Sequence, residues 1–175
     1  MSELKFIFTG PPGVGKSTAI AAVSEFAPVV TDVLATDELS DIKAQTTAAL
    51  DFGEITLDDG EKVRLYGTPG QRRFSFMWEI LIEGGLGLVI LVDNSRPDPL
   101  ADLDIYLENF SGFIRDTGAV IGVTRMESHP QPDLDDFAAH LERHGLALPV
   151  LEVDIRRRED VVQLLDVLMM TCEPA

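Results

Sequence analysis

The sequence predicts an α/β fold: a three-layer, doubly wound, mostly parallel six-stranded sheet with one antiparallel edge strand. Two observations support this class. Short apolar segments of strand length alternate with segments whose apolar residues recur at helical spacing, which is typical of a parallel sheet covered by helices on both faces. An Asp58-Asp59-Gly60 turn also joins two alternating segments, which predicts a hairpin and hence an antiparallel strand. At 175 residues, we expect a single domain, 1–175.

The elements follow from these patterns in chain order. Strand-like segments occur at 4–9, 52–57, 63–66, 86–92, 119–123 and 149–153. Helical spacing of apolar residues occurs at 20–27, 74–82, 103–114, 134–141 and 161–168. Residues 28–40 are mixed and carry no assignment, and residues 42–48 are polar and predict an exposed loop. In a sheet of this type, ligands bind at the carboxyl ends of the strands.

Composition narrows the class of partner. The formal net charge is −16, so the surface repels nucleic acids and anionic membranes, and we expect no nucleic-acid partner. The chain has one cysteine, Cys172, which allows no internal disulfide and is consistent with a reducing compartment. No apolar stretch is long enough to span a bilayer, and the acidic, proline-containing end after Cys172 does not resemble a lipidation box. We therefore expect a cytoplasmic protein without a membrane anchor.

A glycine-rich loop between the first strand and the first helix predicts a phosphate site. Residues 10–17 match G-x-x-x-x-G-K-[ST] at every specified position, in the strand–loop–helix context that the motif requires. Glycines let successive N–H groups turn toward an anion, and the helix N-terminus adds positive potential. Lys16 is expected to reach the outer phosphates and Ser17 to ligate Mg²⁺. The expected nucleotide-binding residues of this loop are Gly10, Gly13, Val14, Gly15, Lys16, Ser17 and Thr18.

Three further segments follow in a recognisable order: Thr47-x-x-x-Asp51-Phe52-Gly53, Gly67-Thr68-Pro69-Gly70-Gln71 and Thr124-Arg125-Met126-Glu127. Together with the phosphate loop they resemble the Ras-like P-loop GTPases over essentially the whole chain. The second and third of the four motifs are similar to those of the bacterial branch related to the gliding-motility (Mgl-type) GTPases. The resemblance implies GTP or GDP as the ligand and Mg²⁺ as the cofactor.

The resemblance also implies roles for the switch residues. Thr47 would ligate Mg²⁺ together with Ser17 and would contact the γ-phosphate through its N–H, with Thr46 as the alternative if the register differs by one. The Gly70 N–H would contact the γ-phosphate. Gln71 would orient the attacking water, so that Gln71 and Lys16 are the expected catalytic residues.

Base recognition is expected from two loops. Glu127 matches the family aspartate that accepts hydrogen bonds from guanine, Arg125 matches the lysine that stacks on the base, and Thr124 replaces the family asparagine. Asp154 and Ile155 lie where the family has S-A-K, and the Ile155 N–H would contact the guanine O6. All five are therefore expected to bind nucleotide.

The sequence departs from the family at two positions. Gly67 stands where the family has the aspartate that supports the Mg²⁺ shell, and either Asp51 or Asp93 could supply that carboxylate. Asp93 is equally explained as a strand-end cap. Pro12 removes one N–H donor from the phosphate loop.

The resemblance implies a GTP-binding switch with slow intrinsic hydrolysis, because no arginine finger is evident. Four large apolar residues follow Gln71. Phe74 and Trp78 share one face and are expected to pack inward, so Phe76 and Met77 on another face predict a surface for a protein partner. The resemblance implies a regulatory protein of the roadblock/longin type as that partner. Two alternatives stay open. One is an ATP-dependent phosphotransferase that uses Asp93 and the arginines at 156–158. The other is a nucleotide-binding pseudo-GTPase without turnover.

Overall fold

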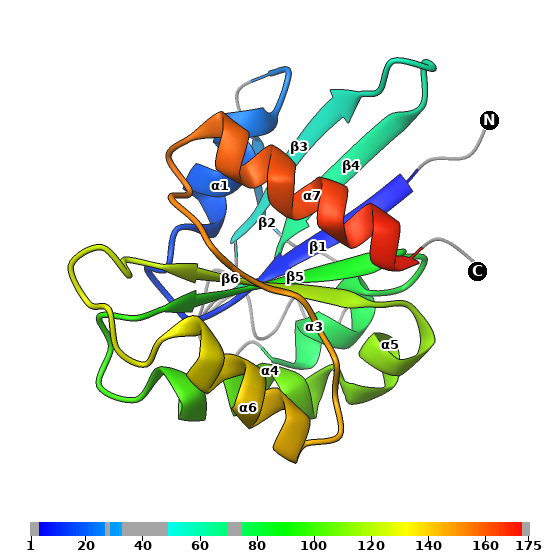
Figure 1. The fold of residues 1–175 in the computed structure, drawn as a ribbon. Coiled ribbons are helices and arrows are strands. Elements are labelled where there is room, and N and C mark those ends of the chain that lie inside the picture. Colours follow the sequence, from blue (N-terminus) through cyan, green and yellow to red (C-terminus); the bar gives the residue numbers. More distant parts are fainter. Residues whose placement is uncertain (1–3, 27–28, 33–48, 70–74, 173–175) are drawn as a thin grey trace.

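The computed structural model describes residues 4–26, 29–32, 49–69 and 75–172. The expected switch residues Thr47, Gly70 and Gln71 lie outside these ranges. The described residues form one seven-stranded sheet in the order β2-β3-β4-β1-β5-β6-β7. Helices cover both of its faces, with α1 and α7 on one side and α3, α4, α5 and α6 on the other (Figure 1). This confirms the three-layer, mostly parallel class.

The strands are β1 (Leu4–Thr9), β2 (Val29–Asp32), β3 (Ala49–Thr56), β4 (Lys62–Gly67), β5 (Gly87–Asp93), β6 (Ala119–Thr124) and β7 (Val150–Glu152). The helices are α1 (Lys16–Val23), α3 (Phe76–Leu81), α4 (Pro99–Asn109), α5 (Ser111–Asp116), α6 (Leu134–Arg143) and α7 (Arg158–Cys172). Each of the five expected helical regions contains a helix. The first, expected over 20–27, ends at Val23, and 103–114 is divided at Phe110 into α4 and α5.

The number of strands corrects the prediction, because the described sheet has seven strands where six were expected. The additional strand is β2, which pairs antiparallel to β3. Its four residues carry too short a pattern to assign from sequence, and the pairing with β3 is what makes them a strand. The hairpin β3–β4 is confirmed, and β3 is the one strand that runs against the others. It lies second from the edge because β2 covers it.

The core lies on both sides of the central strands. Alternate residues of β5 face opposite layers: Val89 and Leu91 pack with helices α1 and α7, and Leu88 and Ile90 pack with α4 and α6. Trp78 of α3 belongs to the second layer, where its ring stacks on Phe110 with 5.4 Å between centroids. Burial on both faces explains why β5 and β6 are apolar up to their last residue, and why Phe6, Ile7 and Phe8 form an apolar run in β1.

Helix α3 corrects one detail of the expected partner surface. Met77 was expected to lie outside the core, but it is buried beside Trp78. Phe76 does stay exposed, and so does Ile80 one turn later. In the described ranges, no helix is long and apolar enough to cross a membrane.

Strands β4, β1, β5 and β6 are parallel neighbours, so their carboxyl ends meet at one edge of the sheet. These ends are Gly67, Thr9, Asp93 and Thr124. The phosphate loop after β1 and the expected base loop after β6 therefore begin at the same edge of the sheet, with β5 between them, although more than a hundred residues separate them in the chain.

Candidate nucleotide-binding site

The phosphate loop connects the end of β1 to the start of α1, as expected. A Cβ at Gly10 would lie 2.5 Å from the Leu91 carbonyl oxygen, so only glycine permits this approach of the loop to β5. Gly13 and Gly15 have φ values of 76° and 108°, in the region that side chains disfavour. Gly15 caps the N-terminus of α1. A glycine-rich loop at a helix N-terminus favours phosphate, because backbone N–H groups and the helix dipole both attract an anion.

Lys16 is the buried cation of the loop, with 8% of its surface exposed. Its ammonium donates to the carbonyls of Gly10 at 2.7 Å and Pro11 at 3.2 Å. Desolvation lowers the pKa of Lys16 to about 8, and the negative charge of Asp51 opposes this shift. A phosphate group would supply the counter-charge that this buried ammonium otherwise obtains only in part.

The residues expected near Mg²⁺ in the described ranges are Ser17, Asp51 and Gly67. Asp51 on β3 is the direct antiparallel partner of Gly67 on β4. A Cβ at Gly67 would lie 3.4 Å from the Asp51 Oδ2 atom, so the carboxylate occupies the space beside the glycine. The Ser17 hydroxyl donates to the same Oδ2 atom. A hydroxyl and a carboxylate oxygen form a hard donor set, which suits Mg²⁺.

The segment that leads toward the expected switch residues is held by three contacts. The Thr68 N–H donates to the Phe8 carbonyl at 2.9 Å, and the Thr68 and Thr9 hydroxyls are 2.8 Å apart. The Trp78 indole donates to the Pro69 carbonyl at 3.0 Å. These contacts fix residues 67–69 against β1 and α3. Sequence reasoning assigned Trp78 to the core but did not detect its hydrogen bond, which depends on the position of α3.

Arg125 and Asp93 pair at the start of the base loop. The Arg125 guanidinium donates to Asp93 Oδ2 at 2.5 Å, and Ser95 donates to Asp93 Oδ1 through both its N–H and its hydroxyl. This occupies both oxygens of Asp93, as expected for a strand-end cap. Arg125, which was expected to stack on the base through its side chain, has a φ of 62°, and its charged end contacts Asp93.

Two polar residues stabilise the base loop from within. The Thr124 hydroxyl donates to the Val92 carbonyl at 3.2 Å and so links the ends of β5 and β6. Asn94 is buried and donates from Nδ2 to the carbonyls of His129 and Pro132. Sequence analysis missed Asn94. Its position directly after the strand that ends at Asp93 is the only local signal that it carries.

The last loop brings the base side and the phosphate side together. A Cβ at Gly15 would lie 2.4 Å from Ile155 Cδ1, so Ile155 packs directly on the phosphate loop. Asp154 accepts from the Arg156 side chain at 2.8 and 2.9 Å. This hydrogen bonding lowers the pKa of Asp154 to about 2, so the carboxylate is ionised at neutral pH.

These loops enclose a cleft of about 790 Å³, within the usual size range for a small-molecule site. Six residues expected to bind nucleotide line it: Val14, Thr124, Arg125, Glu127, Asp154 and Ile155. Glu127 is exposed. The lining does not include the other expected residues of the phosphate loop: Gly10, Gly13, Gly15, Lys16, Ser17 and Thr18. The loop meets the cleft at Val14 and at the contact of Gly15 with Ile155. Thr47, Gly70 and Gln71 lie outside the described residues.

Fold and phosphate loop together define a P-loop nucleotide-binding protein. The chain belongs to the family described as "Conserved hypothetical ATP binding protein", whose model matches residues 8–115. The matched segment contains the phosphate loop, the Ser17–Asp51–Gly67 group and α3. It ends before the base loops, so the family assignment supports nucleotide binding without selecting the base.

Three relatives are similar to at least half of the chain, and one of them is named as a Ras-related protein. An uncharacterized protein of Methanocaldococcus jannaschii is 32% identical over 95 residues, which cover 54% of this chain and 53% of that protein. Intraflagellar transport protein 22 of Chlamydomonas reinhardtii is 28% identical over 111 residues, which cover 62% of this chain and 53% of that protein. Ras-related protein RabC of Dictyostelium discoideum is 24% identical over 175 residues, which cover 97% of this chain and 83% of that protein. The chain spans about half the length of the first two.

These comparisons support a Ras-like protein of the P-loop class. They lend no support to the more specific gliding-motility branch.

Proposed function

We propose that residues 1–175 form a single cytoplasmic domain that acts as a GTP-binding molecular switch with slow intrinsic hydrolysis. The packing of Ile155 on Gly15 carries this proposal. It joins the loop that would contact guanine to the loop that would hold phosphates, as one bound nucleotide requires. Family membership and the Ras-related relative support the same reading.

Guanine preference rests on Glu127. A carboxylate accepts two hydrogen bonds and donates none, which complements the adjacent N1–H and N2 amino donors of guanine. Adenine has an unprotonated N1 at the corresponding edge, so the same carboxylate would face an acceptor and lose its partners. The Ile155 N–H would donate to the guanine O6. Arg125 and Asp154 would shape the rim of the cleft, since their charged ends are paired with Asp93 and Arg156.

The proposed magnesium site uses Ser17 and Thr47 as ligands, with Asp51 as the carboxylate that supports the metal-bound waters. The contact between Ser17 and Asp51 favours Asp51 over Asp93 for this role, because Asp93 is already bound by Arg125 and Ser95. Magnesium bound there would neutralise charge on the phosphates. Lys16 would hold the same phosphates through its buried ammonium.

Turnover is proposed to depend on Gln71, with Gly70 contacting the γ-phosphate. Slow hydrolysis is expected because an arginine finger in the family mechanism contributes about 10³–10⁵ in kcat. A regulatory partner, which the sequence resemblance suggests is of the roadblock/longin type, could supply or position the missing group. The exposed side chains Phe76 (39%) and Ile80 (47%) lie one turn apart on α3, just after this segment, and offer an apolar contact surface.

The structure gives less support to a phosphotransferase. That reading needs a free Asp93 and a mobile arginine-rich lid. Asp93 is paired with Arg125, Arg156 is paired with Asp154, and the Arg158 guanidinium donates to the Val23 carbonyl at 3.1 Å. The pseudo-GTPase alternative keeps the same binding site and differs only in turnover, so a hydrolysis assay separates it from the proposal.

The decisive experiment identifies the nucleotide and then changes the base-reading carboxylate. We expect GDP or GTP to be released from the freshly purified protein. Glu127→Gln presents one acceptor and one donor, so it should weaken GDP binding and strengthen binding of xanthosine diphosphate, whose C2 carries a carbonyl. Glu152→Gln removes a charge from another position on the same cleft and serves as the matched control.

Two results would contradict the proposal. The first is retention of adenine nucleotides alone, and the second is an equal loss of GDP, ADP and xanthosine diphosphate affinity in Glu127→Gln. The first result would leave the phosphate site intact and remove the guanine assignment.

A further inference from the structure

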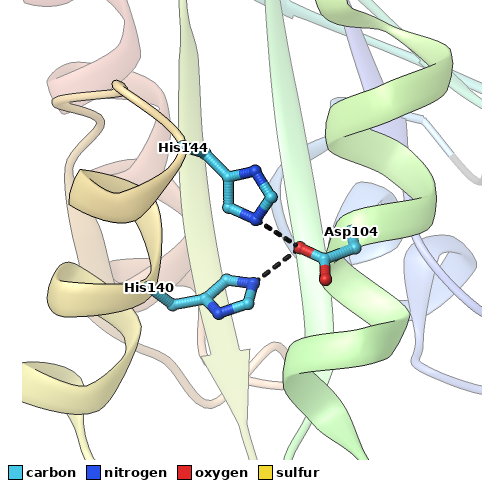
Figure 2. A group of neighbouring side chains, drawn as sticks. All are labelled: Asp104, His140 and His144. Atoms are coloured by element: carbon cyan, nitrogen blue, oxygen red, sulfur yellow. Dashed lines mark hydrogen bonds and ion pairs between the residues drawn. The ribbon is translucent and has the colours of Figure 1, made fainter.

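Two helices away from the nucleotide cleft bring together one carboxylate and two imidazoles. Asp104 lies on α4, His140 lies on α6, and His144 caps the C-terminus of α6 (Figure 2). The Oδ1 atom of Asp104 is 2.6 Å from His140 Nε2 and 3.1 Å from His144 Nε2. Within the described ranges, this is the only group of three or more such side chains close enough to share a metal ion.

The spacing of the two histidines places them on one side of their helix. Residues at i and i+4 are neighbours on a helix surface, and paired histidines at this spacing can bind one zinc ion. Their rings are 4.8 Å apart between centroids. Phe137 and Leu141 anchor the same helix in the core that also contains Leu103, the neighbour of Asp104. The protein core thus sets the distance between the two helices that carry the ligands.

The ligand atoms already have nearly the separation that a single ion requires. One ligand atom of each residue lies within 4.8 Å of the other two. Around a tetrahedral zinc ion with bonds of about 2.0–2.2 Å, ligand atoms are separated by roughly 3.3 Å. Small rotations of exposed or half-exposed side chains would bring the three atoms to that distance. Figure 2 shows both rings directed at the same carboxylate oxygen.

We propose that Asp104, His140 and His144 form a binding site for a divalent transition-metal ion of the zinc type, with water in the fourth position. Two imidazoles and one carboxylate suit Zn²⁺, Ni²⁺ or Cu²⁺, whereas Mg²⁺ prefers oxygen ligands alone. The site is separate from the proposed magnesium site, and none of its three residues lines the nucleotide cleft. Bound metal would cross-link α4 to α6.

Arg143 gives the proposal a second, independent test. Its Nη2 atom is 3.5 Å from His140 Nδ1. When a metal occupies Nε2, the neutral ring carries its proton on Nδ1, which then needs an acceptor. Arginine has only donors, so Arg143 opposes the metal-bound state. Arg143→Gln offers a carbonyl acceptor and should therefore tighten metal binding, which a purely structural role of the histidines would not produce.

The experiment titrates Zn²⁺ into the full chain and follows binding by calorimetry. The chain carries Cys172→Ser, which removes the thiol as a competing ligand, and GDP with excess Mg²⁺ is present throughout to keep the proposed nucleotide site occupied. We expect one Zn²⁺ per chain and a rise in Tm on binding. His140→Gln, His144→Gln and Asp104→Asn should each weaken binding by about 10-fold or more, since changes to outer-shell partners alone cost about 10–100-fold. His129→Gln is the matched control, because it removes the remaining histidine of the chain without touching the site.

Co²⁺ provides a spectroscopic check, since its visible absorption becomes stronger when six-coordinate hydration is replaced by a four-coordinate protein site. Equal Zn²⁺ affinity in wild type and in the His140→Gln/His144→Gln double variant would overturn the proposal. Absence of saturable binding in the wild type would also overturn it, provided that circular dichroism shows a folded chain. Loss of binding in His129→Gln alone would place the metal elsewhere and equally refute the assignment.

Discussion

Lys16 should make the nucleotide-free protein less stable than it would be with an uncharged side chain. Its ammonium is buried and its pKa falls from 10.5 to about 8. Each unit of pKa shift corresponds to 1.36 kcal/mol, so keeping the charge in the folded state costs about 3 kcal/mol. Lys16→Met has a similar length and no charge, and it should therefore raise the free energy of unfolding at pH 7 by up to that amount.

The sign of the pH dependence follows from the direction of this shift. Below pH 8, Lys16 is charged in both the folded and the unfolded chain, so the full penalty is present. Between pH 8 and 10.5, the folded chain binds fewer protons than the unfolded chain, and stability rises with pH by at most about 1.4 kcal/mol per unit. The stability advantage of Lys16→Met should shrink over this window and disappear near its upper end.

Urea unfolding at several pH values from 7 to 10.5, followed by circular dichroism on nucleotide-free protein, measures the effect. Lys62→Met replaces a lysine with 55% side-chain exposure and provides the control. If the wild type binds GDP as proposed, GDP at 1,000 times its Kd should reverse the order of stability, because binding then adds about 4.1 kcal/mol to the wild type. A Lys16→Met protein that is less stable at pH 7, or a stability gap that does not change with pH, would refute the reasoning.

Three further predictions test other parts of the site. Asp51→Asn should raise the Mg²⁺ concentration needed for tight GDP binding, while Asp93→Asn leaves it unchanged; the opposite pattern in a Mg²⁺ titration would assign the role to Asp93. Gln71→Leu should lower single-turnover phosphate release without changing nucleotide affinity, and unaltered release would remove Gln71 from catalysis. Gly15→Ala should lower the free energy of unfolding by about 1–3 kcal/mol, because Gly15 has a φ of 108° and the new Cβ would meet Ile155. Thermal unfolding measures this loss, and an unchanged Tm would show that the loop relaxes around the new side chain.

The phosphate loop and the hairpin could be predicted from sequence because each is a local structure. Gly10 to Ser17 form a turn within eight residues, and the position of Lys16 relative to the glycines depends only on that turn. Gly60, at the turn between β3 and β4, adopts a φ of 89° that favours glycine, so the hairpin too is encoded within a few residues. The alternation of apolar strands and helices similarly predicts the layers, because periodicity records which faces are buried.

Only the tertiary structure decided which of two carboxylates lies beside Gly67. Asp51 reaches Ser17, 34 residues away, because the register of β3 on β4 places Asp51 opposite Gly67. A shift of one residue would turn Asp51 to the other face of the sheet. Asp93 instead meets Arg125, 32 residues away, because β5 and β6 end at the same level.

Contacts between distant segments also explain two other features that could not be predicted from the sequence. His140 and Asp104 are 36 residues apart, and only the packing of α6 beside α4 makes them neighbours. Strand β2 exists because β3 offers it a backbone partner. Local patterns encode local conformation and which faces are buried, whereas register and helix packing depend on contacts between distant segments, so these pairings are determined only when the chain folds.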